Sequence, residues 1–205
     1  MKLKAIVFDC DGVIFDSKEA NRAYYDTILK ILELPPMTEE QLYYAHTHTV
    51  FEVIDYLIPD PILREKAHTL RKEINYSQFI SYVKPEPQVK EVLALLKKSF
   101  KIGMATSRAN TVYQLLDTYK LSNYFDIIIS ALDVKQVKPH PEALYKIMTY
   151  FSIKPKEMLY IGDADIDAEM AERAGVPFVA YKNQRLKADF YVSNFLELLN
   201  IIQIK

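Results

Sequence analysis

The chain has 205 residues, the length of one domain or of one domain that carries an insertion. Half of the residues are hydrophobic and 26% are charged, so the composition excludes disordered, collagenous and low-complexity proteins. Lysine and arginine total 26 against 27 aspartate and glutamate, a formal net charge of −1. This balance predicts no nucleic-acid partner and no membrane partner, so an anionic ligand must be met by a local cluster of residues.

The sequence also predicts where the protein resides. The apolar run near the start stops at Asp9 and is too short for a signal peptide, and no stretch reaches the roughly 18 apolar residues of a membrane span. The single cysteine, Cys10, cannot form an intramolecular disulfide and is typical of a small buried side chain. We expect a cytoplasmic protein.

The first predicted element is a strand over residues 3–8, LKAIVF, which ends in two acids and a glycine. From residue 17 to 82 the apolar residues follow a helical period, and proline pairs interrupt it. Thr38 to Gln41 resembles a capping box. We expect three to four helices in this stretch and no strand.

After residue 84 the pattern alternates between helix and strand. The predicted elements are a helix near 89–96, a strand over 101–106, a helix over 110–119, a strand over 126–131, a helix over 140–151, a strand over 158–162, a helix over 165–174, a strand over 177–181, and a closing edge strand and helix. This alternation predicts an α/β fold, a Rossmann-like doubly wound parallel sheet. Residues 1–16 and 83–205 would form this core, and residues 17–82 an inserted α-helical domain.

Polar residues follow four of the predicted strands, where open parallel sheets bind ligands. They are Asp9 and Asp11, Thr106 and Ser107, Lys138, and Asp163 with Asp167. Each has an ordinary explanation when taken singly. A lone lysine is usually a surface charge, and the acids of GDADID, Asp165 in particular, are also typical of a helix N-terminal cap and of first-turn charges that complement the helix dipole. Together they offer carboxylates for a hard divalent cation, and a hydroxyl and an ammonium group for a phosphate.

A calcium loop is the alternative reading of the first acidic motif. An EF-hand needs oxygen ligands at its fifth and twelfth positions, where this chain has Val13 and Ala20. Mg²⁺ needs fewer carboxylates, so Asp9 and Asp163 with a backbone carbonyl would suffice.

Four motifs, in order, resemble those of the haloacid dehalogenase superfamily in its Mg²⁺-dependent phosphatase branch. They are FDCDG (8–12), MATS (104–107), VKPHPE (137–142) and IGDADID (161–167). The resemblance covers nearly the whole chain. Within the superfamily, the chain is similar to the phosphoglycolate phosphatase and β-phosphoglucomutase group. It implies that residues 17–82 are a C1 cap that closes over the active site and determines specificity.

The resemblance also implies a role for each motif residue. Asp9 would attack phosphorus to form an aspartyl-phosphate, and Asp11 would protonate the leaving oxygen, activate water and bind Mg²⁺ through its carbonyl. Thr106, Ser107 and Asn110 would bind phosphate, Lys138 would neutralise its charge, and Asp163 would ligate Mg²⁺. Asp167 would bind a water on the metal ion or orient Lys138.

Within the family, Asp11 argues against the dehalogenase and phosphonatase branches, which lack an acid at this position. Asn21 stands where mutases of the group usually carry a histidine. We therefore expect hydrolysis of a small-molecule phosphate monoester, with phosphoglycolate ahead of sugar phosphates, nucleotides and pyrophosphate. A β-phosphoglucomutase-like phosphotransferase and a non-catalytic phospho-binding module remain as alternatives, and we expect a monomer or a weak homodimer.

Substrate-binding candidates in the inserted domain come from residue type and position. They are His46 and His48, and more weakly Arg22, Tyr43 and Arg71. The histidine pair lies where relatives place a specificity loop, although two histidines at this spacing are more often part of a loop or a helix surface.

Overall fold

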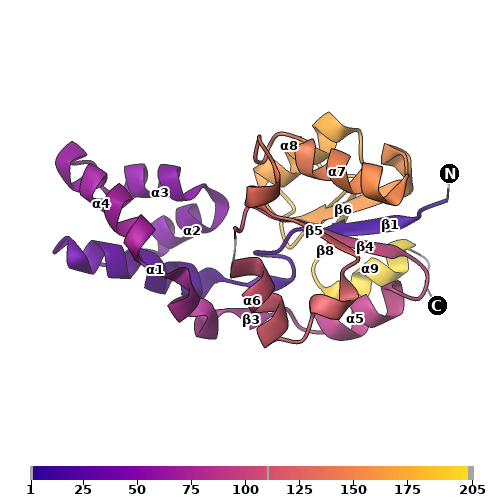
Figure 1. Ribbon diagram of the computed structural model, residues 1–205, viewed down its shortest axis with the longest axis horizontal. Coiled ribbons are helices and arrows are strands. Elements are labelled where there is room, and N and C mark those ends of the chain that lie inside the picture. Colours follow the sequence, from indigo (N-terminus) through magenta and orange to yellow (C-terminus); the bar gives the residue numbers. More distant parts are fainter. Residues whose placement is uncertain (1, 110, 203–205) are drawn as a thin grey trace. The chain divides into compact units, whose positions relative to one another are not determined.

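The computed structural model describes residues 2–109 and 111–202. The chain divides into two compact units, Met1–Phe15 with Pro85–Lys205, and Asp16–Lys84. We call the first the sheet unit and the second the helical unit. The short strands β2 (Phe15–Asp16) and β3 (Lys84–Pro85) pair with each other and carry the two connections between the units (Figure 1).

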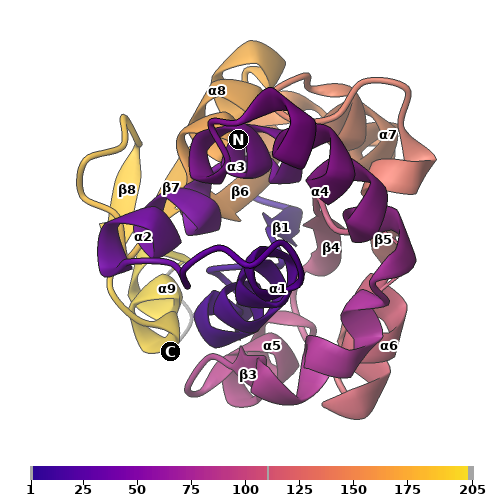
Figure 2. The same cartoon turned by 90° about the vertical axis from the view of Figure 1, so that its left-hand side faces the viewer.

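The sheet unit is built on six strands in the order β5-β4-β1-β6-β7-β8, which Figure 2 shows side by side. Each neighbouring pair runs parallel, so the predicted doubly wound fold is confirmed. The strands are β1 (Ala5–Phe8), β4 (Lys101–Ala105), β5 (Ile127–Ile129), β6 (Met158–Gly162), β7 (Phe178–Tyr181) and β8 (Phe190–Val192). Because the chain passes from β1 to β4 on one side and later to β6 on the other, the order reverses beside β1, where such sheets bind ligands.

Helices cover both faces of this sheet (Figures 1 and 2). One face carries α7 (Glu142–Phe151) and α8 (Asp165–Ala174), and the other carries α5 (Val89–Leu96), α6 (Thr111–Thr118) and α9 (Phe195–Ile202). Strands β1 and β6 are buried along their whole length, as expected of apolar runs in a sheet covered on both sides. Phe8 of β1 stacks on Phe195 of α9, with ring centroids 6.0 Å apart.

Several element boundaries differ from the prediction by one or two residues, and two of them have a clear local reason. The strand predicted to reach residue 131 ends at Ile129, because Ser130 begins a 3-10 turn in which its side chain accepts from Leu132. The helix predicted from residue 140 begins at Glu142, because Pro141 stands at its N-cap.

The helical unit contains α1 (Lys18–Ile31), α2 (Glu39–Thr47), α3 (Val50–Leu57) and α4 (Pro61–Glu73), then a 3-10 helix over Tyr76–Tyr82. Helices α3 and α4 lie alongside each other in both views. The capping box is confirmed: the backbone N–H of Gln41 donates to Oγ1 of Thr38, and that of Thr38 donates to the Gln41 side chain. Within the described residues, no helix combines the length and the apolar character needed to cross a membrane.

Candidate active site

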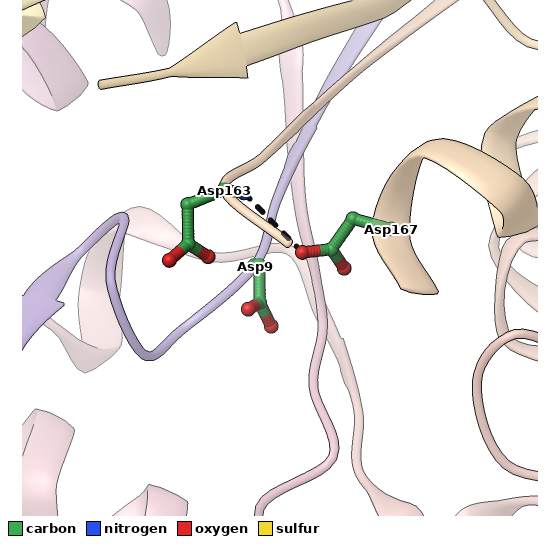
Figure 3. A group of neighbouring side chains, drawn as sticks. All are labelled: Asp9, Asp163 and Asp167. Carbon is green, nitrogen blue, oxygen red and sulfur yellow. Dashed lines mark hydrogen bonds between the residues drawn. The ribbon is translucent and has the colours of Figure 1, made fainter. Parts of the chain in front are cut away.

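Three carboxylates meet at the ends of the two central strands (Figure 3). Asp9 follows β1, Asp163 follows β6, and Asp167 lies in the first turn of α8. Strands β1 and β6 are neighbours in register, with Phe8 opposite Ile161. One oxygen from each carboxylate lies within 4.8 Å of the others, and Asp9 and Asp167 are buried.

Lys138 completes this cluster from a loop far away in the sequence. Its Nζ donates to Oδ1 of Asp9 and to Oδ1 of Asp167, at 2.7 Å in each case. Only 4% of its side chain is exposed. Although burial opposes the charge, Asp167 and Asp9 together raise the pKa of Lys138 above its ordinary value, so the ammonium group stays charged.

The carboxylates carry more negative charge than Lys138 can balance. Burial raises the pKa of Asp9 to about 7, with Asp167 and Asp11 adding to the effect and Lys138 opposing it. Burial and the charge of Asp167 raise the pKa of Asp163 as well. Buried oxygen ligands with an excess of negative charge are the donor set that suits a hard divalent cation such as Mg²⁺.

Asp167 has every carboxylate oxygen engaged. Its Oδ1 accepts from Lys138 and, at 2.7 Å, from the hydroxyl of Tyr160. Its Oδ2 accepts from the backbone N–H groups of Asp163 and Ala164, at 3.3 and 3.2 Å. Asp165 is an exposed acid in the first turn of α8, as expected of a charge that complements the helix dipole. The N-cap itself is Ala164, and the carboxylate of Asp167 reaches back to the free N–H groups.

Thr106 lies buried after β4, and Ser107 beside it is exposed. Oγ1 of Thr106 accepts from the backbone N–H of Arg108 at 3.0 Å. The guanidinium group of Arg108 holds both carboxylate oxygens of Asp11, with Nε 3.0 Å from Oδ2 and Nη2 in contact with Oδ1. The Arg108 side chain is 6% exposed and the Asp11 side chain is 32% exposed, so the arginine is buried while the carboxylate remains accessible to water.

Comparisons with known proteins identify the family of the chain. Residues 6–181 match the family model described as haloacid dehalogenase-like hydrolase. The chain belongs to this family. A HAD-superfamily hydrolase of subfamily IA from Geobacter sulfurreducens is 36% identical, covers 98% of this chain and 96% of its own, and superposes with a TM-score of 0.84.

Other relatives of this hydrolase carry more specific names. The pyrophosphatase PpaX of Bacillus mycoides is 28% identical, and the match covers 98% of each chain. A candidate phosphoglycolate phosphatase from Lactobacillus plantarum has the same fold, with a TM-score of 0.87 at 19% identity over 98% of this chain and 100% of its own.

Three residues of this hydrolase join the site although the sequence analysis did not select them. Arg108 directly follows Thr106 and Ser107, and this position was the sequence feature that could have indicated its place in the site. Tyr160 is fully buried within a strand and has the appearance of a core residue. Asn183 donates from Nδ2 to the carbonyl of Asp163 at 2.9 Å and so restrains the acidic loop.

The predicted substrate-binding residues of the helical unit differ in their exposure and in their partners. His48 is exposed at the C-cap of α2, where its ring stacks on Tyr44 with centroids 3.7 Å apart. Arg22 is bound to Glu39, and Tyr43 is exposed. Asn110 and the side chain of His46 lie outside the described part of the chain, so their predicted roles stay predictions.

Gly12 determines how Asp163 fits in this hydrolase. Its φ is +76°, and a Cβ at this position would lie 2.0 Å from Oδ2 of Asp163. We expect Gly12→Ala to displace that carboxylate and weaken Mg²⁺ binding by about 10–100-fold in calorimetry. Gly175→Ala is the matched control, because φ is +67° there but the nearest atom, in Pro155, is 4.0 Å away. Equal Mg²⁺ affinity in the two variants would contradict the role of Gly12.

Proposed function

We propose that the protein is a Mg²⁺-dependent phosphatase that hydrolyses a small phosphorylated molecule through an aspartyl-phosphate on Asp9. The single observation that carries the proposal is the buried pairing of Lys138 with Asp9 and Asp167, beside Asp163. A nucleophilic carboxylate next to a fixed cation suits attack on a phosphoryl group. Membership of the family, and relatives named as phosphatase and pyrophosphatase, support the same reaction class.

In this proposal Asp9, Asp163 and the backbone carbonyl of Asp11 hold the metal ion. The ion would neutralise the excess of carboxylate charge and draw charge from the phosphoryl oxygens. Asp167 has both oxygens occupied by hydrogen bonds, which supports an orienting role for it rather than direct ligation.

Each side chain of the site has a distinct role in the proposed reaction. Asp9 attacks phosphorus while the bond from phosphorus to the leaving oxygen breaks, and Asp11 gives that oxygen a proton. Asp11 then takes a proton from the water that attacks the aspartyl-phosphate and releases inorganic phosphate. Thr106 and the amides that follow it hold phosphoryl oxygens, and Lys138 balances their charge.

Arg108 adds a constraint on this sequence of steps. Because its guanidinium group holds both oxygens of Asp11, the ion pair has to open before Asp11 can protonate a leaving group. The phosphoryl group is a suitable competitor for the guanidinium, since arginine binds phosphate and carboxylate through the same planar fork.

Two observations bear on the substrate and on the alternative transferase reaction. Phosphoglycolate and pyrophosphate, the substrates that the relatives' names indicate, both carry a second anionic group.

Asn21, in the position where mutases use histidine, accepts from the hydroxyl of Tyr76 at 3.1 Å. An amide neither gives nor takes a proton in catalysis, so water remains the favoured phosphoryl acceptor. We propose that the helical unit acts as the family's cap and determines specificity.

The test is phosphate release from phosphoglycolate, pyrophosphate, sugar phosphates and nucleotides, with Mg²⁺ and with a chelator. Release that requires the metal would support the phosphatase, and its rates would rank the substrates. Transfer of phosphate to a second sugar hydroxyl would favour the phosphotransferase, and no turnover with any compound would favour a non-catalytic module.

Asp11→Asn tests the proton-transfer role. We expect turnover to fall by about 10²–10⁴-fold for alkyl phosphates, because their leaving oxygen needs a proton. The loss should be smaller for p-nitrophenyl phosphate, whose leaving group departs as an anion. Steady-state rates with both substrates measure this difference, and an equal loss for both would contradict the assignment.

A further inference from the structure

The backbone on both sides of Asp163 is held by other side chains of the sheet unit. The N–H of Asp163 donates to Oδ2 of Asp167 at 3.3 Å (Figure 3). The next peptide group is held at both edges: its carbonyl accepts from Nδ2 of Asn183 at 2.9 Å, and its N–H, on Ala164, donates to Oδ2 of Asp167 at 3.2 Å. Because a peptide group is planar, hydrogen bonds on its two opposite edges fix its orientation. The direction of the Asp163 carboxylate therefore depends on Asn183 as well as on Asp167.

Asn183 lies in a turn that leaves β7 in an unusual backbone conformation. Lys182, directly after the end of the strand, has a φ of +54°, in the left-handed region that glycine adopts freely and lysine does not. Its N–H donates to the carbonyl of Val192 in β8 at 2.8 Å. A backbone conformation of this kind persists where surrounding contacts enforce it, so the side chain of Lys182 should have a partner.

That partner is the buried carboxylate of Glu86. Nζ of Lys182 lies 2.8 Å from Oε1 and 2.6 Å from Oε2 of Glu86, whose side chain is 6% exposed. Oε2 also accepts from the hydroxyl of Tyr181 at 3.0 Å, and the backbone N–H of Glu86 donates to the carbonyl of Ile14 at 3.0 Å. A buried carboxylate is unfavourable without a cation. The ion pair therefore stabilises the left-handed turn, in which the next residue is Asn183.

We propose that Asn183 and Lys182 are positioning residues for Asp163 as a ligand of Mg²⁺. Lys182, paired with Glu86, holds the turn after β7, and Asn183 in this turn fixes the peptide group that follows Asp163. This inference rests on the metal site of the proposed function. It adds an ion pair outside the carboxylate cluster to the groups on which the affinity for Mg²⁺ depends.

Asn183→Ala tests the first step, because it removes the amide that donates to the carbonyl of Asp163. We expect Mg²⁺ affinity in calorimetry to fall about 10–100-fold. Asn194→Ala is the matched control: its side chain bonds only to Glu197 among the contacts described, at the start of α9 in the same unit. This control should lower stability and keep the wild-type affinity for Mg²⁺. Wild-type affinity in Asn183→Ala, or an equal loss in both variants, would overturn the proposal.

Lys182→Met tests the second step, since methionine keeps most of the stem and removes the charge. We expect a smaller loss of Mg²⁺ affinity, about 3–10-fold, and Lys182→Arg should recover most of it because arginine can still pair with Glu86. The double variant with Asn183→Ala should bind Mg²⁺ as Asn183→Ala alone does, because Lys182 acts through Asn183. Losses that simply multiply in the double variant would contradict this coupling.

A second measurement needs neither metal nor turnover. Hydrogen exchange by NMR, in the metal-free protein, should show the amide of Ala164 exchanging about tenfold faster in Asn183→Ala than in the wild type, since its peptide group is then held at one edge only. Unchanged exchange would contradict the role of Asn183. A wild-type protein that binds no Mg²⁺ would reject the metal site of the proposed function, and the exchange rate would still decide whether Asn183 holds Asp163.

Discussion

Asp9→Asn should abolish phosphate release, lowering kcat by roughly 10⁴-fold or more, while the protein stays folded. The amide has nearly the shape of the carboxylate but lacks the charged oxygen that attacks phosphorus. Asp9 is 8% exposed, and its Oδ1 is held by Lys138 at 2.7 Å, so water has little room to replace the missing nucleophile. The measurements are phosphate release under saturating substrate and Mg²⁺, and mass spectrometry of the acid-quenched protein for phosphate on Asp9.

The matched control for this variant is Asp165→Asn. Asp165 lies in the same acidic motif as Asp163 but is exposed, so its loss should leave turnover within about twofold. A phosphorylated residue other than Asp9, or release by Asp9→Asn at the wild-type rate, would sink the nucleophile assignment.

Lys138→Met should lower turnover by about 10²–10³-fold and also destabilise the protein. Methionine replaces the stem of lysine but leaves Asp9 and Asp167 buried without their counter-ion. Breaking a buried pair in this way costs about 3–5 kcal/mol of unfolding free energy. Chemical denaturation without metal, together with steady-state rates, measures both effects.

The stability loss in Lys138→Met should depend on pH. The pKa of Asp9 is raised above its unfolded value to about 7, so the folded state binds more protons between roughly pH 4 and pH 7. Stability therefore falls as pH rises through this range, and the variant, whose carboxylates lack Lys138, should lose most near pH 8 and least near pH 5. Lys187→Met, which removes an exposed partner of Glu172, serves as the control and should change neither rate nor stability. A loss independent of pH would contradict the charge argument.

The local sequence determined the fold class and most of the site. Apolar runs such as Ala5–Phe8, followed directly by acids, predict buried parallel strands that deliver carboxylates to one edge of the sheet. The four motifs predict Asp9, Asp163 and Lys138 as partners, because each follows or lies near the end of a strand. Helix caps such as Thr38 were also predictable, since a cap depends on residues three positions apart.

Only the tertiary structure decided which groups pair. Arg108 and Asp11 are 97 positions apart, and Tyr160 resembles an ordinary strand residue until its hydroxyl is seen to donate to Asp167. The arginines Arg22, Arg64 and Arg71 are alike in sequence, yet in the structure the first two pair with carboxylates and Arg71 stacks on Phe51. The reason is physical: periodicity and capping act over a few residues along the chain, whereas charge pairing and burial depend on distances in space, which the whole fold has to establish first.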